Sequence, residues 1–408
     1  MNPTIAVIGL GYIGLPTAAA LAAPGTRVHG IDVSQRTVDM VNRGELPFVE
    51  PGLEQALQSA VRRGDLTAST TTPHADVYIV AVPTPFQDDH QADLSYIEAA
   101  TRTLSAQLTG GELVILESTS PPGTTEKMGE WIDEERPDLA GNVLLAHCPE
   151  RVLPGRVMIE LVKNDRVIGG VTPEAAVAAQ QVYRIFCEGE LLLTDARTAE
   201  MAKLVENSYR DVNIAFANEL SQVAAKLDID VWELINLANH HPRVNILQPG
   251  PGVGGHCIAV DPWFIVSAAP QESRLIRTAR EVNDAKPHQV IDQILAHAKD
   301  VENPTIALLG LAFKANIDDL RESPARYIAK ELADRLPEAT ILAVEPHVEE
   351  LPAELAALSN VRLSPLNEAL EASQVVALLV DHDLFGLVDH AVLADKAVVD
   401  TRGLWRNV

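Results

Sequence analysis

The chain has 408 residues, of which 47% are hydrophobic and 22% charged, and its formal net charge at pH 7 is −25. This length suffices for two or three domains, and the composition is that of an ordinary globular protein. The acidity favours solubility and argues against a nucleic-acid partner, and apolar runs such as Val375–Val380 are too short to span a bilayer.

The N-terminal part alternates short β-branched runs with helical patterns, and prolines follow the later runs. The alternation predicts βαβ units and a parallel sheet, whose ligands bind at the carboxyl ends of the strands. The expected strands are Ile5–Ile8, Val28–Ile31, Val77–Val82, Leu113–Leu116, Val143–Ala146 and Val167–Gly169.

The middle of the chain is helical. The segment Ala199–Lys226 contains no Gly or Pro, and as one helix it would be about 42 Å long. We expect a spine between two domains or across a dimer. A Gly/Pro-rich loop follows at His241–Asp261, and then more helix to about Lys299.

A second βαβ pattern closes the chain. Its expected strands are Thr305–Leu309, Ile341–Val344, Val375–Val380 and Val398–Asp400. The predicted fold class is therefore α/β, with two Rossmann-like doubly wound domains joined by a helical middle with a long central helix. The predicted domains are 1–196, 197–300 and 301–408.

The first expected strand runs directly into Gly9-Leu10-Gly11-Tyr12-Ile13-Gly14, and a helical pattern follows. This placement predicts a dinucleotide site, with the pyrophosphate at the helix N-terminus; a turn that serves packing alone is the alternative. Asp32 ends the second strand, where it would accept hydrogen bonds from a ribose diol, so NAD is favoured over NADP. Arg36 is a mild counter-signal, since an arginine there can meet a 2′-phosphate or lie over the adenine.

A polar row lies along the long helix. Its spacing puts the side chains on one face, and a solvated surface is the usual explanation for such a row. The row consists of Glu200, Lys203, Asn207 and Arg210.

Cys257 follows a loop with four glycines in six residues, Gly250–Gly255, and Asp261 lies four residues beyond it. The glycines leave little steric cover over the thiol, although an isolated cysteine is more often buried and inert. No second Cys/His pair stands at zinc-ligand spacing, so no metal is predicted. With Cys148 and Cys187 scattered elsewhere and no signal-peptide pattern at the N-terminus, we expect a reducing, cytoplasmic location.

A dinucleotide site and an exposed thiol together indicate one chemistry. An alcohol loses a hydride to give an aldehyde, a thiolate adds to that aldehyde, a second hydride leaves, and water cleaves the thioester. A lysine and an asparagine would stabilise the oxyanion.

With these motifs, the chain resembles the UDP-glucose/GDP-mannose dehydrogenase superfamily over essentially its whole length. The blocks Glu150–Gly155 and His241–Leu247 resemble the bacterial branch of UDP-N-acetyl-D-mannosamine 6-dehydrogenases. The resemblance implies NAD-dependent four-electron oxidation of UDP-N-acetyl-D-mannosamine at its 6-hydroxymethyl group, giving UDP-N-acetyl-D-mannosaminuronate for surface polysaccharide. It also implies a homodimer built on the long helix, with the active site shared between subunits.

The resemblance implies these catalytic roles. Cys257 is the nucleophile and Lys203 the general acid/base or oxyanion-stabilising residue. Asn207 assists at the oxyanion, Asp261 orients water or the lysine, and Glu150 is linked to thioester hydrolysis. The UDP-glucose branch has a second glutamate where this chain has Pro154, and Thr119 completes the expected catalytic set.

The resemblance also assigns binding positions. For the cofactor they are Gly9, Gly11, Tyr12, Ile13, Gly14, Asp32, Arg36, Thr84, Thr119 and Arg321. For the nucleotide sugar they are Arg151, Val152, Lys203, Asn207, Arg210, His241, Arg243, Gly254, Phe313, Lys314 and Arg402. The segment Gly310–Lys314 lacks three glycines, so it does not indicate a second dinucleotide. An ion pair with Asp318 or Asp319 is the alternative for Arg321.

Three other functions stay open. The same chemistry on UDP-GlcNAc, UDP-glucose or GDP-mannose changes only the sugar. A two-electron alcohol dehydrogenase would stop at the aldehyde and dispense with Cys257. A non-catalytic NAD-binding regulatory protein is disfavoured, because it would not need Lys203, Asn207, Cys257 and Asp261 together.

Overall fold

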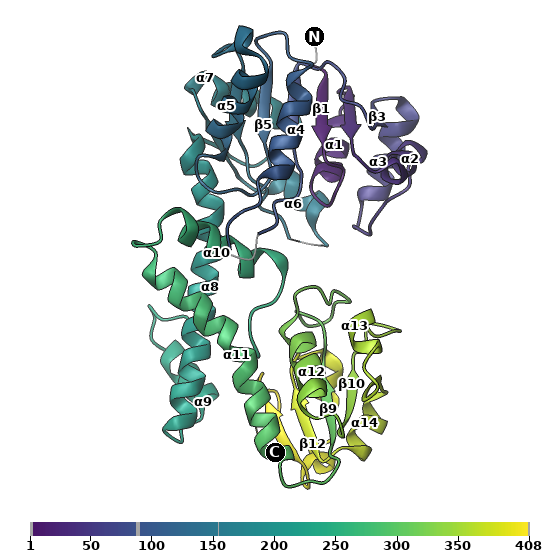
Figure 1. The fold of residues 1–408 in the computed structure, drawn as a ribbon, viewed down its shortest axis with the longest axis vertical. Coiled ribbons are helices and arrows are strands. Elements are labelled where there is room, and N and C mark those ends of the chain that lie inside the picture. The colour runs from purple at the N-terminus through teal and green to yellow at the C-terminus, as the bar shows by residue number, and fades with distance from the viewer. Residues whose placement is uncertain (1–2, 87–89, 154, 407–408) are drawn as a thin grey trace. The chain divides into compact units, whose positions relative to one another are not determined.

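A computed structural model describes residues 3–86, 90–153 and 155–406. The chain forms two compact units, Met1–Glu206 and Asn207–Val408 (Figure 1). The division falls within the long helix α8 (Ala196–Lys226), which confirms the predicted central helix. It begins earlier than predicted because the Asp195 side chain accepts hydrogen bonds from the backbone N–H and the hydroxyl of Thr198.

The described residues of the first unit contain a sheet with the strand order β3-β2-β1-β4-β5-β6-β7-β8. Its strands are β1 (Ile5–Ile8), β2 (Val28–Ile31), β3 (Leu66–Ser69), β4 (Val77–Val80), β5 (Leu113–Leu116), β6 (Leu144–His147), β7 (Arg166–Gly170) and β8 (Leu191–Asp195). All neighbours are parallel except β6 and β7, which are antiparallel. The expected parallel sheet is therefore mixed at this step, where the short helix α6 (Val157–Lys163) connects the two strands.

Helices cover both faces of this sheet (Figure 1). Ile5 and Val7 of β1 belong to one hydrophobic cluster, and Ala6 and Ile8 belong to another. Alternate side chains of one strand thus enter two cores, as a doubly wound fold requires. The remaining helices are α1 (Gly14–Ala22), α2 (Gln35–Arg43), α3 (Leu53–Arg63), α4 (Ser95–Ser105), α5 (Thr124–Glu135) and α7 (Pro173–Tyr183), with a 3-10 turn at Pro137–Leu139.

The second unit combines helices with a smaller parallel sheet of order β11-β10-β9-β12-β13, which repeats the order of the first five strands of the other sheet. Its strands are β9 (Thr305–Leu309), β10 (Thr340–Val344), β11 (Val361–Leu363), β12 (Val375–Leu378) and β13 (Ala397–Asp400). Its helices, besides most of α8, are α9 (Val231–Asn239), α10 (His256–Ala268), α11 (Arg274–Ala298), α12 (Pro324–Arg335), α13 (Ala353–Ala356) and α14 (Leu366–Ala372), with 3-10 turns at Asp383–Leu387 and His390–Leu393.

Ile306 and Leu308 of β9 face one cluster, and Ala307 and Leu309 face the other, so this sheet is also buried on both sides. The predicted fold class is confirmed. Within the described ranges, no helix has the length and apolar character that crossing a membrane requires.

Candidate active site

The turn between β1 and α1 has the shape that a dinucleotide site needs. Gly9 has φ +94°, and a Cβ there would lie 2.4 Å from the carbonyl oxygen of Ala81. A Cβ on Gly14 would lie 1.9 Å from the carbonyl oxygen of Gly9. A Cβ on Gly11 would meet nothing within 4 Å. The fold itself therefore requires Gly9 and Gly14, whereas the open space at Gly11 fits a pyrophosphate lying against the backbone.

Asp32 stands directly after β2, beside this turn. Its Oδ2 accepts the Leu10 N–H at 3.0 Å and its Oδ1 accepts the Ser34 N–H at 2.9 Å. Arg36 is exposed in the first turn of α2. The hydroxyl oxygen of Thr84 is buried and lacks a hydrogen-bond partner among the described residues, which suits a residue that lines a ligand.

Glu150 and Lys203 interact electrostatically within the first unit. Burial raises the pKa of the Glu150 carboxyl, and the positive charge of Lys203 acts in the opposite direction. Lys203 is itself only 8% exposed, although its row on α8 suggested a solvated face. The backbone N–H of Val152 donates to Glu150 Oε1. Pro154 lies outside the described residues, so its place beside Glu150 is not described.

Some residues of the polar row on α8 are buried within the fold, and others are exposed. The Glu200 carboxylate accepts hydrogen bonds from the Gly123 N–H at 2.5 Å and the Thr125 N–H at 2.7 Å, at the N-terminus of α5. It is 1% exposed, so the solvated interpretation is wrong for Glu200 as well as for Lys203. Arg210, by contrast, is exposed.

Cys257 and Asp261 lie one turn apart in α10, at its N-terminal end. Cys257 is exposed, whereas Cys148 and Cys187 are buried, so the interpretation as an inert buried thiol is wrong for Cys257. Asp261 is 4% exposed, and its Oδ2 accepts a hydrogen bond of 2.5 Å from Asn207 Nδ2. An exposed sulfur thus stands one turn from a buried carboxylate that holds an amide of α8.

The glycine loop before Cys257 packs against residues that the sequence assigned to substrate. A Cβ on Gly254 would lie 2.7 Å from Phe313 Cβ, and one on Gly250 would lie 2.7 Å from Arg402 Nη1. Arg402 forms an ion pair with Asp381 at 3.0 Å and donates to the carbonyl of Pro249 at 3.3 Å. The second unit therefore places Phe313 against Gly254 and Arg402 against Gly250, in the same glycine loop.

Other predicted residues lie at the surface or are engaged elsewhere. Lys314, His241 and Arg243 are exposed. Arg151 forms an ion pair with Glu206 at 2.6 Å. Arg321 forms an ion pair with Asp319 at 2.7 Å, which is the alternative that the sequence offered for it.

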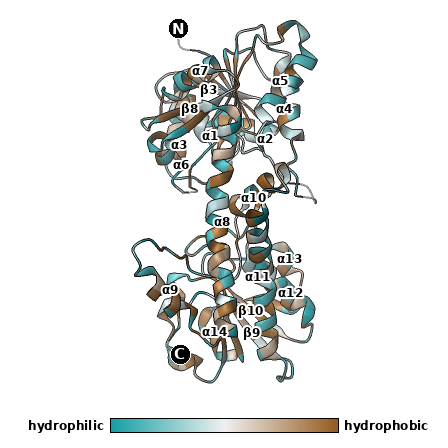
Figure 2. Cartoon of the chain, turned by 90° about the vertical axis from the view of Figure 1, so that its left-hand side faces the viewer, coloured by the Kyte–Doolittle hydropathy of each residue, from teal (hydrophilic) through white to brown (hydrophobic). Residues whose placement is uncertain are grey.

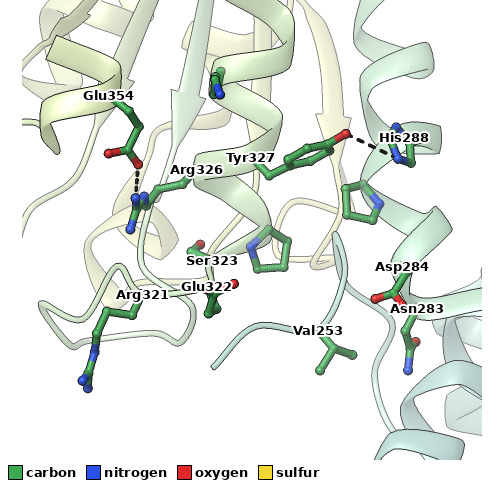
Figure 3. Close-up of a pocket in the computed structure, with 13 residues that line it drawn as sticks. Val253, Asn283, Asp284, His288, Arg321, Glu322, Ser323, Arg326, Tyr327 and Glu354 are labelled. Atoms are coloured by element: carbon green, nitrogen blue, oxygen red, sulfur yellow. Dashed lines mark hydrogen bonds and ion pairs between the residues drawn. The ribbon is translucent and has the colours of Figure 1, made fainter. Parts of the chain in front are cut away.

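A cavity of about 620 Å³ lies in the second unit, beside the glycine loop (Figure 3). Val253 of that loop, Arg321 and the start of α12 contribute to its wall. Arg326 pairs with Glu354 across the wall, and the Tyr327 hydroxyl lies 3.4 Å from His288 Nε2. Charged and aromatic side chains therefore line this cavity.

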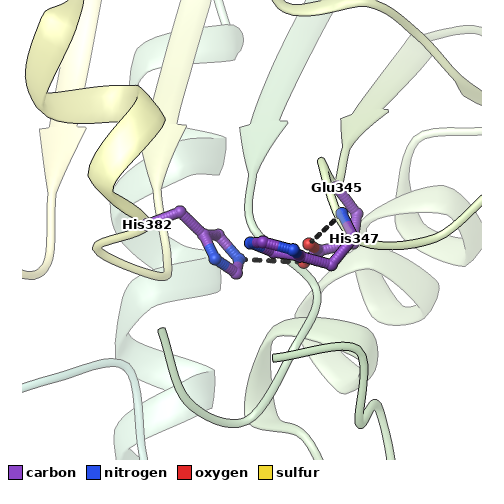
Figure 4. Close-up of side chains that lie close together, drawn as sticks. All are labelled: Glu345, His347 and His382. Carbon is purple, nitrogen blue, oxygen red and sulfur yellow. Dashed lines mark hydrogen bonds and ion pairs between the residues drawn. The ribbon is translucent and has the colours of Figure 1, made fainter. Parts of the chain in front are cut away.

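Glu345 and His382 form a cluster that the sequence did not predict (Figure 4). Glu345 Oε2 accepts the N–H groups of Leu311 and Ala312 at 2.8 and 3.0 Å and lies 3.0 Å from His382 Nε2. His382 Nδ1 accepts the Asn316 N–H at 2.9 Å. Although Glu345, His347 and His382 have metal-ligand chemistry, the contacts of Glu345 and His382 serve to hold the segment that carries Phe313 and Lys314. Glu345 directly follows β10, as Asp32 follows β2, but its histidine partner is distant in the sequence.

The glycine turn, the acidic residue after β2 and the doubly wound sheet define a dinucleotide-binding protein. The chain belongs to the UDP-glucose/GDP-mannose dehydrogenase family, because it matches that family's NAD binding domain over residues 3–187, its central domain over residues 197–285 and its UDP binding domain over residues 307–407. It is therefore an NAD-dependent oxidoreductase.

Similar proteins cover almost the entire chain. UDP-N-acetyl-D-mannosamine dehydrogenase of Escherichia coli K12 is 56% identical over 99% of both chains. NDP-N-acetyl-D-galactosaminuronic acid dehydrogenase of Ralstonia nicotianae is 55% identical, over 98% of this chain and 96% of its own. The solved structure of a UDP-N-acetyl-mannosamine dehydrogenase from Staphylococcus aureus is 41% identical, has a TM-score of 0.83, and matches 99% of this chain and 96% of its own.

Proposed function

We propose that this enzyme oxidises the 6-hydroxymethyl group of UDP-N-acetyl-D-mannosamine to a carboxylate, giving UDP-N-acetyl-D-mannosaminuronate. The observation that carries the proposal is the exposed Cys257 one turn before Asp261, whose carboxylate holds Asn207. The family membership and the 56% identity to a UDP-N-acetyl-D-mannosamine dehydrogenase support the substrate class.

The proposed reaction removes four electrons in two oxidations. A bound NAD⁺ would supply the hydride acceptor for each of them. Between the two oxidations the Cys257 thiolate adds to the aldehyde carbon, and the carbonyl oxygen becomes an alkoxide. Loss of the second hydride leaves a thioester. Water then attacks its carbonyl carbon, the carbon–sulfur bond breaks, and the thiolate leaves as the carboxylate forms.

The proposed roles of the other residues follow from their chemistry. Lys203 takes and returns the hydroxyl proton, and with Asn207 it stabilises the oxyanion. Asp261 orients Asn207, through the hydrogen bond described above, and the attacking water. Glu150 accepts a proton from that water, a role that its raised pKa and the neighbouring Lys203 support. Thr119, just beyond β5, lines the reacting end of the cofactor.

We assign the remaining predicted residues to binding. Those proposed for NAD are Gly9, Gly11, Tyr12, Ile13, Gly14, Asp32, Arg36, Thr84, Thr119 and Arg321. Those proposed for the nucleotide sugar are Arg151, Val152, Lys203, Asn207, Arg210, His241, Arg243, Gly254, Phe313, Lys314 and Arg402. The arginines suit diphosphate oxygens, which they can bind in a bidentate manner.

The galacto counterpart is a second candidate substrate, because a relative named for NDP-N-acetyl-D-galactosaminuronic acid is 55% identical. NADH release from purified enzyme, measured against a panel of nucleotide sugars, separates the candidates. The panel contains UDP-N-acetyl-D-mannosamine, its galacto and gluco counterparts, UDP-glucose and GDP-mannose. We expect about two NADH per sugar consumed and the highest kcat/KM with the manno compound. Faster turnover of another sugar would replace the substrate and leave the mechanism standing.

The same assay tests the two other classes of function. One NADH per sugar, with aldehyde accumulating, would show a two-electron alcohol dehydrogenase. Tight NADH binding without turnover of any nucleotide sugar would show a regulatory protein.

We further propose a cytoplasmic homodimer built on α8, with its active site shared between subunits, that serves surface polysaccharide synthesis. Three cysteines without a disulfide suit a reducing compartment. Apolar and polar residues alternate along α8 (Figure 2). Tyr209, Phe216 and Val223 are spaced by seven residues and are 72%, 53% and 47% exposed. Such a stripe fits the same stripe of a second copy.

A further inference from the structure

Glu50 is a buried carboxylate in the segment between α2 and α3, and none of the roles above uses it. It is only 3% exposed. Its Oε2 accepts the Tyr12 hydroxyl at 2.6 Å and the Gly155 N–H at 3.0 Å, and its Oε1 accepts the Val157 N–H at 2.9 Å. The Glu50 carboxylate thus accepts hydrogen bonds from three donors, which lie in two distant parts of the sequence.

The two parts are the two ligand-binding segments of the first unit. Tyr12 stands between Gly11 and Ile13 in the dinucleotide turn. Gly155 and Val157 end the loop that begins with Glu150, Arg151 and Val152, and Val157 opens α6. The Gly155 N–H also lies 3.3 Å from the Tyr12 hydroxyl oxygen, so the two segments meet around Glu50.

The other anchors of the loop lead elsewhere. Glu160 of α6 accepts the Leu153 N–H at 2.8 Å, and the Asn164 amide donates to the Arg151 carbonyl at 3.1 Å. Both residues follow the loop in sequence, and the ion pair of Arg151 with Glu206 leads to α8. The hydrogen bonds that link the loop to the dinucleotide turn are therefore those of Glu50 and Tyr12.

We propose that Glu50 is a positioning residue that couples the cofactor site to the substrate loop. A dinucleotide lying against Gly11 fixes the turn that carries Tyr12, and the Glu50 carboxylate transmits that position to the backbone of Gly155 and Val157. Each ligand then raises the affinity for the other by the same factor, because linkage is reciprocal. The inference rests on the proposed function, since it takes Arg151 and Val152 to contact the nucleotide sugar.

The experiment measures this coupling directly with the full-length enzyme. NADH binding is followed by its fluorescence, with and without saturating UDP-N-acetyl-D-mannosamine, and the ratio of the two dissociation constants is the coupling factor. We expect the wild type to show at least about fivefold coupling. In Glu50→Gln an NH₂ group replaces one acceptor oxygen and would face a donor, so the factor should fall towards one, and the KM for the sugar should rise more than kcat falls.

Two further variants make the result specific. Tyr12→Phe removes only the hydroxyl and should lower the coupling factor as Glu50→Gln does, which keeps the test valid if Glu50→Gln folds poorly. Glu54→Gln makes the same charge change at an exposed position of α3, and it should keep the wild-type factor.

Each outcome decides the proposal. A wild-type factor of one, or an unchanged factor in Glu50→Gln and Tyr12→Phe, overturns it, even if both ligands bind more weakly. Failure of the proposed function looks different, because NADH would then bind while no nucleotide sugar of the panel binds or reacts.

Discussion

Asn207 Nδ2 donates a hydrogen bond of 2.5 Å to Asp261 Oδ2, and this bond ties α8 to α10 one turn from the exposed sulfur of Cys257. Asp261→Asn keeps the size of the side chain and removes the charge that orients the amide. We expect kcat to fall by about 10²-fold, as when an oxyanion donor is lost, while NADH affinity is retained. Steady-state kinetics and NADH fluorescence measure the two quantities.

The matched control is Glu281→Gln, which removes a charge at an exposed position of α11. It should behave as the wild type. A wild-type kcat in Asp261→Asn would remove Asp261 from the mechanism.

Cys257→Ser tests the covalent route, because a hydroxyl is a poor substitute for a thiolate near neutral pH. We expect overall turnover to be lost and NADH to bind as in the wild type. Iodoacetamide should label Cys257 alone in the native protein, because Cys148 and Cys187 are buried, and mass spectrometry of the peptides shows which thiols react. A serine variant that forms the carboxylate at nearly the wild-type rate would exclude the thioester.

The sequence predicted the sheet centres better than their edges. The strands β3, β8 and β11 were not predicted, and each lies at an edge of its sheet. Thr67 of β3 and Arg362 of β11 are exposed polar residues that interrupt the apolar run expected of a strand buried on both faces. β8 begins with Leu191–Leu193, but Leu192 and Leu193 are exposed, so this strand does not have the burial of a central strand.

Motif residues could be located in the sequence, but their partners could not. The glycine turn and Cys257 have local patterns. Glu50 acts through contacts 38 and 105 positions away, and Glu345 through a histidine 37 positions away. Such pairs arise only when the fold brings segments together, which is why neither acid was predicted.

Asp32→Ala should weaken NAD⁺ binding by about 1–3 kcal/mol, the loss expected for charge-assisted hydrogen bonds to the ribose. Part of that loss comes from the turn itself, because Asp32 also accepts the Leu10 N–H. Isothermal titration with NADH measures the affinity. Asp39→Ala, at an exposed position of α2, is the control and should bind NADH normally. Equal use of NADP⁺ by the wild type would show that Arg36 rather than Asp32 decides cofactor choice.

The proposed dimer predicts that Phe216→Asp yields monomers, because it places a charge in the middle of the exposed stripe on α8. Sedimentation velocity over a range of concentrations reports the mass. Leu387→Asp makes the same kind of change at an apolar position that is 81% exposed, and it should leave the mass unchanged. If the stripe forms no interface, the two variants will sediment alike.

We expect His147 to lower the free energy of unfolding of the protein as the pH falls. This residue ends β6 and is completely buried. Burial lowers the pKa of its imidazole to about 3 from 6.5. Above pH 6.5 the ring is neutral in both the folded and the unfolded chain. Below that pH the unfolded chain takes up a proton that the folded chain does not, so the stability of the fold decreases as the pH falls towards 3.

His147→Leu removes this effect and keeps an uncharged side chain at this buried position. We expect its free energy of unfolding, relative to the wild type, to rise by about 2 kcal/mol between pH 7.5 and pH 5.0. Urea unfolding at the two pH values measures the difference, and His390→Leu is the control for loss of a histidine at the surface. A difference that does not change with pH would mean that the folded protein accommodates the charged ring of His147, against the burial seen here.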